Sequence, residues 1–138
     1  MRYSTFITIF AISMVSLIFA ACEKEDDNPD TPPTDASFKG NFVNAVHSTS
    51  GVATIDQEET TLTLTNFKTD SGPDLNIYLA SSNSSVTADY IDLGDIKGLN
   101  GTYTYTLPGN TDFLNYKYVV VWCVDFDVNF GYATLVKQ

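Results

Sequence analysis

The chain has 138 residues, and its 17 acidic side chains outnumber seven basic ones to give a net charge of −10 at neutral pH. Proteins that bind nucleic acid neutralise phosphates with clustered lysine and arginine, so this charge balance excludes DNA and RNA as natural partners. Once the N-terminal segment is set aside, the remaining length is enough for one domain around one hydrophobic core.

The first 21 residues have the layout of an export signal. One charge, on Arg2, precedes a largely apolar run over residues 6–19, and two alanines then lead to Cys22. The apolar run has fourteen residues, whereas a helix needs about 20 to cross a membrane, so the sequence favours a cleaved signal peptide over a permanent span.

The end of this signal indicates a lipid anchor. Phe19-Ala20-Ala21-Cys22 resembles the lipobox of bacterial lipoproteins, with phenylalanine where leucine is usual. The resemblance implies cleavage before Cys22 and a diacylglycerol on its sulfur, so that acyl chains hold the protein in the membrane. The alternative is an ordinary signal peptide, cut after one of the two alanines, that leaves a free thiol.

Residues 22–36 are predicted to be the lipidated cysteine and a disordered acidic tether. Positions 23–35 contain no side chain suited to a core and hold three of the five prolines. Lys24-Glu25-Asp26 also resembles the export signal of Bacteroidetes lipoproteins, which implies an outer-membrane protein that faces outward. The alternative is a solvated acidic spacer on a protein that faces the periplasm.

The remainder, residues 37–138, is predicted to be an all-β domain. Short alternating segments rich in Thr, Val, Tyr and Phe are separated by Gly, Asn, Asp and Ser, which is typical of strands joined by turns. About eight strands at this spacing indicate an antiparallel β-sandwich. We expect the strands at residues 41–48, 51–57, 60–67, 74–80, 90–94, 102–107, 116–126 and 129–136.

One predicted strand and one turn stand out. Between Val119 and Val124 both faces of the strand are apolar, which places it in the middle of the fold with cover on both sides. Gly72-Pro73-Asp74 is a predicted structural turn, in which proline fixes φ and the aspartate can accept hydrogen bonds from backbone N–H groups.

Several segments, in order over nearly all of residues 38–138, together resemble the DM-thirteen domain. The resemblance implies a β-sandwich related to extracellular haem-binding and sugar-binding sandwiches, and it implies an electron-transfer module whose cysteine is a redox thiol or a haem ligand. The position that matches this cysteine is Cys123. The matching residues are His47 with Gly51, Leu64-Thr65-Asn66-Phe67, Gly72-Pro73-Asp74-Leu75, Tyr78-Leu79, Leu93-Gly94, Gly101-Thr102-Tyr103, Leu107-Pro108, Trp122-Cys123, Phe126, Phe130-Gly131 and Ala133.

The candidates for redox chemistry or cofactor binding are Cys123, its neighbour Trp122 and His47, the sole imidazole of the chain. With Cys22 acylated, Cys123 has no partner for a disulfide, and an unpaired thiol in an oxidising compartment needs an explanation. The explanation that requires no chemistry is core packing, because cysteine is also a small hydrophobe. A haem would be held by axial ligands and packing alone, since no haem-attachment motif is present.

Two hypotheses about function follow. The first is a cell-envelope lipoprotein that transfers electrons through Cys123, or through a haem-type cofactor bound near it, to a redox partner. The second is a non-redox module for binding a cell-surface ligand or for adhesion, with Cys123 as part of the core. No catalytic residue and no metal site is predicted, because no hydrolase, phosphate-loop, zinc or EF-hand motif occurs. Strand tyrosines such as Tyr118 and Tyr132 could relay electrons, although packing is their more common role.

Overall fold

A computed structural model of the chain describes residues 29–86 and 88–138. The predicted signal peptide and Cys22 lie outside the described residues. The described part contains no helix that is both long and apolar enough to cross a membrane. It forms the antiparallel strands β1 (Ala36–Asn44), β2 (Thr49–Asp56), β3 (Thr61–Thr69), β4 (Leu75–Ala80), β5 (Tyr90–Asp95), β6 (Asn100–Thr106), β7 (Tyr118–Cys123), β8 (Val128–Thr134) and β9 (Val136–Lys137).

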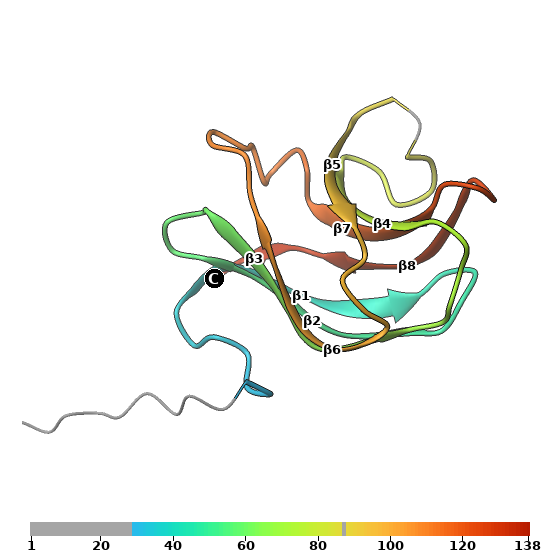
Figure 1. Cartoon of the computed structure of the whole chain (residues 1–138). Coiled ribbons are helices and arrows are strands. Elements are labelled where there is room, and N and C mark those ends of the chain that lie inside the picture. The colour runs from blue at the N-terminus through green and yellow to red at the C-terminus, as the bar shows by residue number, and fades with distance from the viewer. Residues whose placement is uncertain (1–28, 87) are drawn as a thin grey trace, which may run out of the picture.

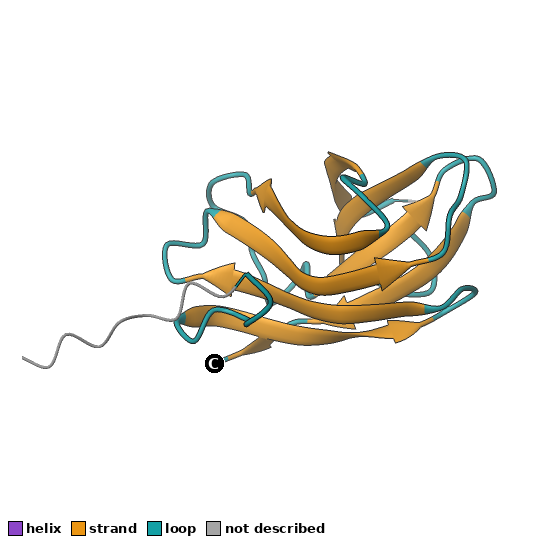
Figure 2. Ribbon diagram, turned by 60° about the horizontal axis from the view of Figure 1, so that its bottom comes forward, coloured by secondary structure: helices purple, strands orange, loops and turns teal. Residues whose placement is uncertain are grey.

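The strands follow one hydrogen-bonded path that folds into two facing layers (Figures 1 and 2). One layer has the order β1-β2-β3-β6 and the other the order β1-β8-β7-β4-β5. Strand β1 belongs to both, because its first part pairs with β2 as far as Asn41 and its last part, Phe42–Asn44, pairs with β8. The all-β sandwich predicted from the sequence is therefore confirmed.

The opposite side of the sandwich is partly closed by the link between its edge strands, β5 and β6. Residues 96–99 form this link and bond to both layers. The N–H of Ile96 donates to the carbonyl of Leu75 on β4 (2.8 Å), and the N–H of Thr69 on β3 donates to the carbonyl of Leu99 (3.0 Å). Because the two layers are joined along both sides, the sandwich approaches the shape of a closed barrel.

Two apolar clusters cover the two faces of β7, as the sequence predicted for this strand. The inner core lies between the layers and includes Val119, Val121 and Cys123, all with no exposed surface. The outer cluster lies on the other face of the β7 layer and consists of Tyr78, Ala80, Val86, Val120 and Trp122. Val86 belongs to the loop between β4 and β5, which therefore folds back over the sheet.

Two predicted strands extend further toward the C-terminus than the strands in the structure. The predicted strand over 41–48 is instead β1, which begins at Ala36 and ends at Asn44, and residues 45–48 form a loop. The N–H groups of Ala45 and His47 both donate to the carbonyl of Phe130 (3.0 Å each), which turns this segment away from a ladder with β2. The predicted strand over 116–126 keeps only Tyr118–Cys123.

The described part of the tether lies against the first layer. The side-chain amide of Asn66 donates to the carbonyl of Asp30 (2.9 Å), and the hydroxyl of Thr102 donates to the carbonyl of Pro29 (3.1 Å). Asn66 lies at an irregularity in the pairing of β3 with β6 and has a φ of 50°. In Figure 1 this blue segment runs beneath the layer toward the start of β1.

Gly131 on β8 lies where two strands approach each other closely. A Cβ atom built on Gly131 would collide with the side chain of Thr49, whereas one built on Gly109 would meet no atom within 4 Å. Gly131 pairs with Val121 of β7 and with Asn44 of β1, so it sits where the two layers share a strand.

We expect Gly131→Ala to lower the free energy of unfolding by about 1–3 kcal/mol, because the added methyl overpacks a buried site. Urea denaturation followed by circular dichroism measures the change. Gly109→Ala is the matched control and should stay within about 0.5 kcal/mol of the wild type. Equal stabilities for the two variants would show that the region around Thr49 adjusts without cost.

Candidate functional site

Strand β7 positions Cys123 and Trp122 on opposite faces of one layer. Cys123 pairs in register with Leu75 on β4 and Val128 on β8, and its side chain joins the inner core with no exposed surface. Trp122 is 6% exposed and belongs to the outer cluster. The alternation of side chains along a strand therefore separates the two candidates by the thickness of a sheet.

The surroundings of Cys123 are those of a packed apolar side chain. Its thiol makes no hydrogen bond or ion pair with any other described residue. The flanking residues on its face of β7 and β4 are aliphatic, and Asp125, two residues further along the chain, lies exposed in the hairpin after β7. Such a site suits cysteine as a small hydrophobe and offers no cation to activate it.

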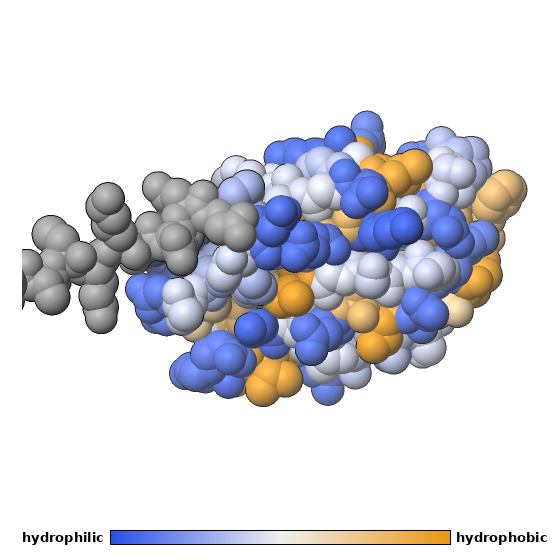
Figure 3. Space-filling model, turned by 90° about the horizontal axis from the view of Figure 1, so that it is seen from below, coloured by the Kyte–Doolittle hydropathy of each residue, from blue (hydrophilic) through white to orange (hydrophobic). Residues whose placement is uncertain are grey.

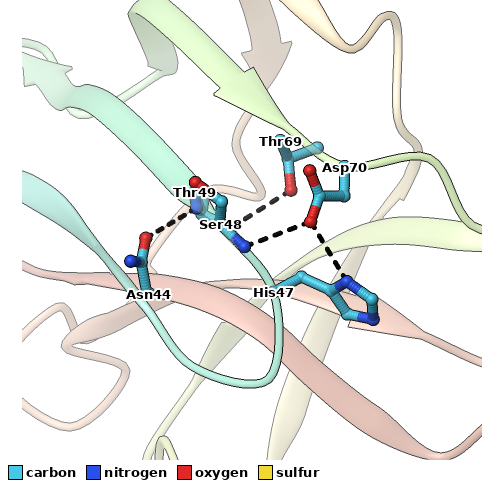
Figure 4. Close-up of polar contacts among 6 residues, drawn as sticks. All are labelled: Asn44, His47, Ser48, Thr49, Thr69 and Asp70. Atoms are coloured by element: carbon cyan, nitrogen blue, oxygen red, sulfur yellow. Dashed lines mark hydrogen bonds and ion pairs between the residues drawn. The ribbon is translucent and has the colours of Figure 1, made fainter.

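His47 lies on the surface in the loop between β1 and β2. Its Nδ1 atom is 3.2 Å from Oδ2 of Asp70, and the N–H of Ser48 donates to the same oxygen (3.3 Å). The imidazole lies against the ring of Phe130 with 3.9 Å between the ring centroids. Figure 4 shows this pair beside the hydrogen bond between the hydroxyls of Thr49 and Thr69 (3.1 Å).

The structure does not bring His47 and Cys123 together as ligands of one cofactor. His47 bonds to Asp70 on the outer side of Phe130, whereas Cys123 lies inside the core that Phe130 helps to form. A haem iron needs an open direction at each ligand atom, and the fully buried sulfur has none. Within residues 29–86 and 88–138, no group of three or more His, Cys, Asp or Glu side chains could hold a metal ion. The residues as packed therefore do not fit a haem on Cys123 and His47.

The predicted turn Gly72-Pro73-Asp74 connects β3 to β4 beside the β7 hairpin. A Cβ atom on Gly72 would come within 2.9 Å of the side chains of Leu75 and Phe130, so the turn packs directly on the core. Asp74 accepts a hydrogen bond from the N–H of Val124 (2.8 Å), through its backbone carbonyl. The turn thus ties the start of β4 to the hairpin that follows Cys123.

Tyr78 of the outer cluster and its neighbour Tyr90 were not named as candidates for electron transfer from the sequence. The rings of Tyr78 and Tyr90 stack with centroids 4.5 Å apart and planes 18° apart. Tyr78 is buried, whereas Tyr90 is 41% exposed, so the stack connects the cluster to the surface. Burial, together with the charge of Asp92, raises the pKa of Tyr78 to about 12. The signal in the sequence was that Tyr78 alternates with Ile77 and Leu79 and so must face away from the inner core.

Four further tyrosines, among them the two named in the sequence analysis, contribute packing and hydrogen bonds. Tyr118 and Tyr132 form an edge-to-face pair, with centroids 5.8 Å apart, at the border of the outer cluster. Tyr105 is buried in the inner core, and this burial raises its pKa. Tyr116 donates a hydrogen bond to Asp89 (2.7 Å), which raises the pKa of Tyr116 and lowers that of Asp89.

We expect the thiol of Cys123 to be unreactive in the native protein, because a reagent reaches it only when the sandwich opens. Mass spectrometry after alkylation with and without denaturant measures the labelled fraction of the peptide that contains Cys123. Leu114→Cys is the positive control, since residue 114 is 75% exposed and its thiol should react at once. Rapid native labelling of Cys123 would contradict the packing described above.

Comparison with known proteins gives one match. The family model described as electron transfer DM13 matches residues 41–135, which is more than half of the chain. The match includes His47 in the loop between β1 and β2, and strand β7 with Trp122 and Cys123. No curated protein and no solved structure matches the chain.

Proposed function

The chain belongs to the electron transfer DM13 family, and from that premise we propose that it is a lipid-anchored module of the cell envelope that passes single electrons through Trp122 and the tyrosines of the outer cluster. The observation that supports it is that Trp122 and Tyr78 belong to one outer cluster, and that Tyr78 stacks on Tyr90, which is 41% exposed.

The arrangement of the outer cluster supports this proposal. Tyr78 and Trp122 lie on the same face of the paired strands β4 and β7, where Asn76 is the register partner of Trp122. The stacked ring of Tyr90 extends the cluster to the edge strand β5. An oxidant on a partner protein could therefore take one electron at Tyr90, whose exposed phenol would lose its proton to water. An electron from Trp122 and a proton from water would restore Tyr90, and a reductant on a second partner would then return an electron to the indole radical cation.

The proposed electron route does not pass through Cys123. Loss of an electron from a thiol is accompanied by loss of its proton, and the described structure gives Cys123 no hydrogen-bond acceptor that could take it. A haem-type cofactor ligated by Cys123 is not part of the proposal either, because the residues do not fit one. The electron route through β7 thus uses the face that carries Trp122.

Flash photolysis with a ruthenium oxidant tests the relay. Photogenerated Ru(III) takes one electron from the protein and becomes Ru(II), leaving an indole radical cation on the sole tryptophan of the chain. Transient absorption should detect this radical in the wild type and not in Trp122→Phe, and Tyr90→Phe should slow its formation. Tyr103→Phe, on the other layer, is the matched control and should leave the signal unchanged. A wild type that forms only tyrosyl radicals, in the same yield as Trp122→Phe, would refute the relay.

The second candidate is a non-redox module for binding a ligand at the cell surface or for adhesion. The observation that favours it is the complete burial of Cys123, which core packing explains without any chemistry. Absence of the tryptophan radical, together with a thiol that stays unreactive in the native state, would leave this second candidate.

The proposed location is the outer membrane, with the protein held by a lipid on Cys22 and facing outward. We expect mass spectrometry of the mature protein to find an acylated Cys22 as its first residue. Cys22→Ala should abolish acylation and release the protein from the membrane fraction. An unmodified Cys22→Ala product that remains in the membrane would show that another part of the chain anchors it.

A further inference from the structure

We propose that the loops at the end of the sandwich away from the C-terminus form a docking surface for a basic protein, one whose apolar patch is ringed by lysine or arginine. These distal loops comprise residues 45–48, 70–74 and 124–127. In Figures 1 and 2 they lie together at one end, opposite the C-terminus and the start of β1. The proposal does not depend on electron transfer.

Backbone and side-chain hydrogen bonds tie the distal loops into one surface. The N–H of Val46 donates to the carbonyl of Asn129 at the start of β8 (3.0 Å), directly after the third loop. Asp70 accepts from the N–H of Ser48 (3.3 Å) and so joins the first loop to the second. The bond from Val124 to Asp74 joins the second loop to the third. A surface held in this way needs little ordering when a partner binds, which lowers the entropic cost of association.

The distal loops expose large apolar side chains. Val46 and Phe126 are each 64% exposed, and Val124 is 43% exposed. Figure 3 shows orange apolar patches among blue polar atoms at the end away from the grey N-terminal segment. A single exposed apolar residue is ordinary, but a group on linked loops is typical of an interaction site. Phe126 is the expected anchor, since aromatic residues at the centre of an interface carry most of its binding energy.

The charges around these apolar side chains indicate the charge that a partner must carry. The distal loops carry four carboxylates, on Asp70, Asp74, Asp125 and Asp127, and contain no lysine or arginine. Two of them flank Phe126 directly in the sequence. The only imidazole of the chain, His47, is held by Asp70. Complementary charge steers association and fixes orientation, so the expected partner is positive around an apolar centre.

The position of the distal loops suits docking on a tethered protein. The described tether residues reach the domain on the outer side of the first layer and enter β1 at Ala36, at the end where the C-terminus lies (Figure 1). The distal loops therefore point away from the attachment of the tether. A partner can approach them without displacing the segment held by Asn66 and Thr102.

Binding of cytochrome c, a basic protein whose exposed haem edge is ringed by lysines, tests the surface. Surface plasmon resonance with the immobilised full-length mature protein measures the Kd at low ionic strength and its change with added salt. We expect Phe126→Ser to raise the Kd about tenfold. Leu114→Ser is the matched control, because Leu114 is equally an exposed apolar residue (75%) but lies in the loop between β6 and β7, and it should bind like the wild type.

Two double variants, each of which removes two carboxylate charges, test whether charge contributes to docking. Asp125→Asn with Asp127→Asn should weaken binding several-fold and reduce its salt dependence. Glu58→Gln with Glu59→Gln removes the same charge from the turn between β2 and β3, and should leave the Kd unchanged. No binding by the wild type at low salt, or equal losses in the distal variants and their controls, would overturn the proposal. Binding that persists in Trp122→Phe, without a tryptophan radical in the wild type, would uphold the docking surface and reject the electron relay.

Discussion

Strand β7 is covered on both faces, and this double burial governs where Cys123 and Trp122 lie. Between β4 and β8 the strand has no solvent side, so its alternating side chains must enter one of two apolar clusters. Cys123 goes to the inner core and Trp122 to the outer cluster. The chemistry open to each is set by this division, since the core isolates the thiol while the outer cluster links the indole to tyrosines near the surface.

The architecture and the central strand could be predicted because they depend on local patterns. Apolar residues on both faces between Val119 and Val124 mark a buried strand in any β fold, and turn residues mark the ends of its neighbours. The C-terminal end of the strand predicted over 41–48 could not be placed in this way, because Ala45 and Val46 are apolar like the core residues of β1. Their N–H groups bond instead to β8, which is more than eighty residues away in the sequence.

The candidate site was predictable as a set of residues and only in part as an arrangement. Cys123, Trp122 and His47 are rare residue types, so composition alone draws attention to them. The separation of Trp122 from Cys123 follows from the alternation of side chains along β7, which the sequence shows. The position of His47 depends on its contacts with Phe130 and Asp70, which leave no local signal. The stack of Tyr78 on Tyr90 was missed for the same reason, since it forms between β4 and β5 across a loop that folds back over the sheet.

The contacts of Asn66 and Thr102 with the tether would shorten the free chain between the domain and the lipid that we propose on Cys22. An extended chain gains at most about 3.6 Å per residue, so a free tether up to Ala36 would allow a height of about 50 Å above the bilayer. Capture of the carbonyls of Pro29 and Asp30 leaves seven residues, or about 25 Å. With the proposed lipid in place, the domain would stay close to the membrane surface, where it would meet other anchored proteins at a higher effective concentration.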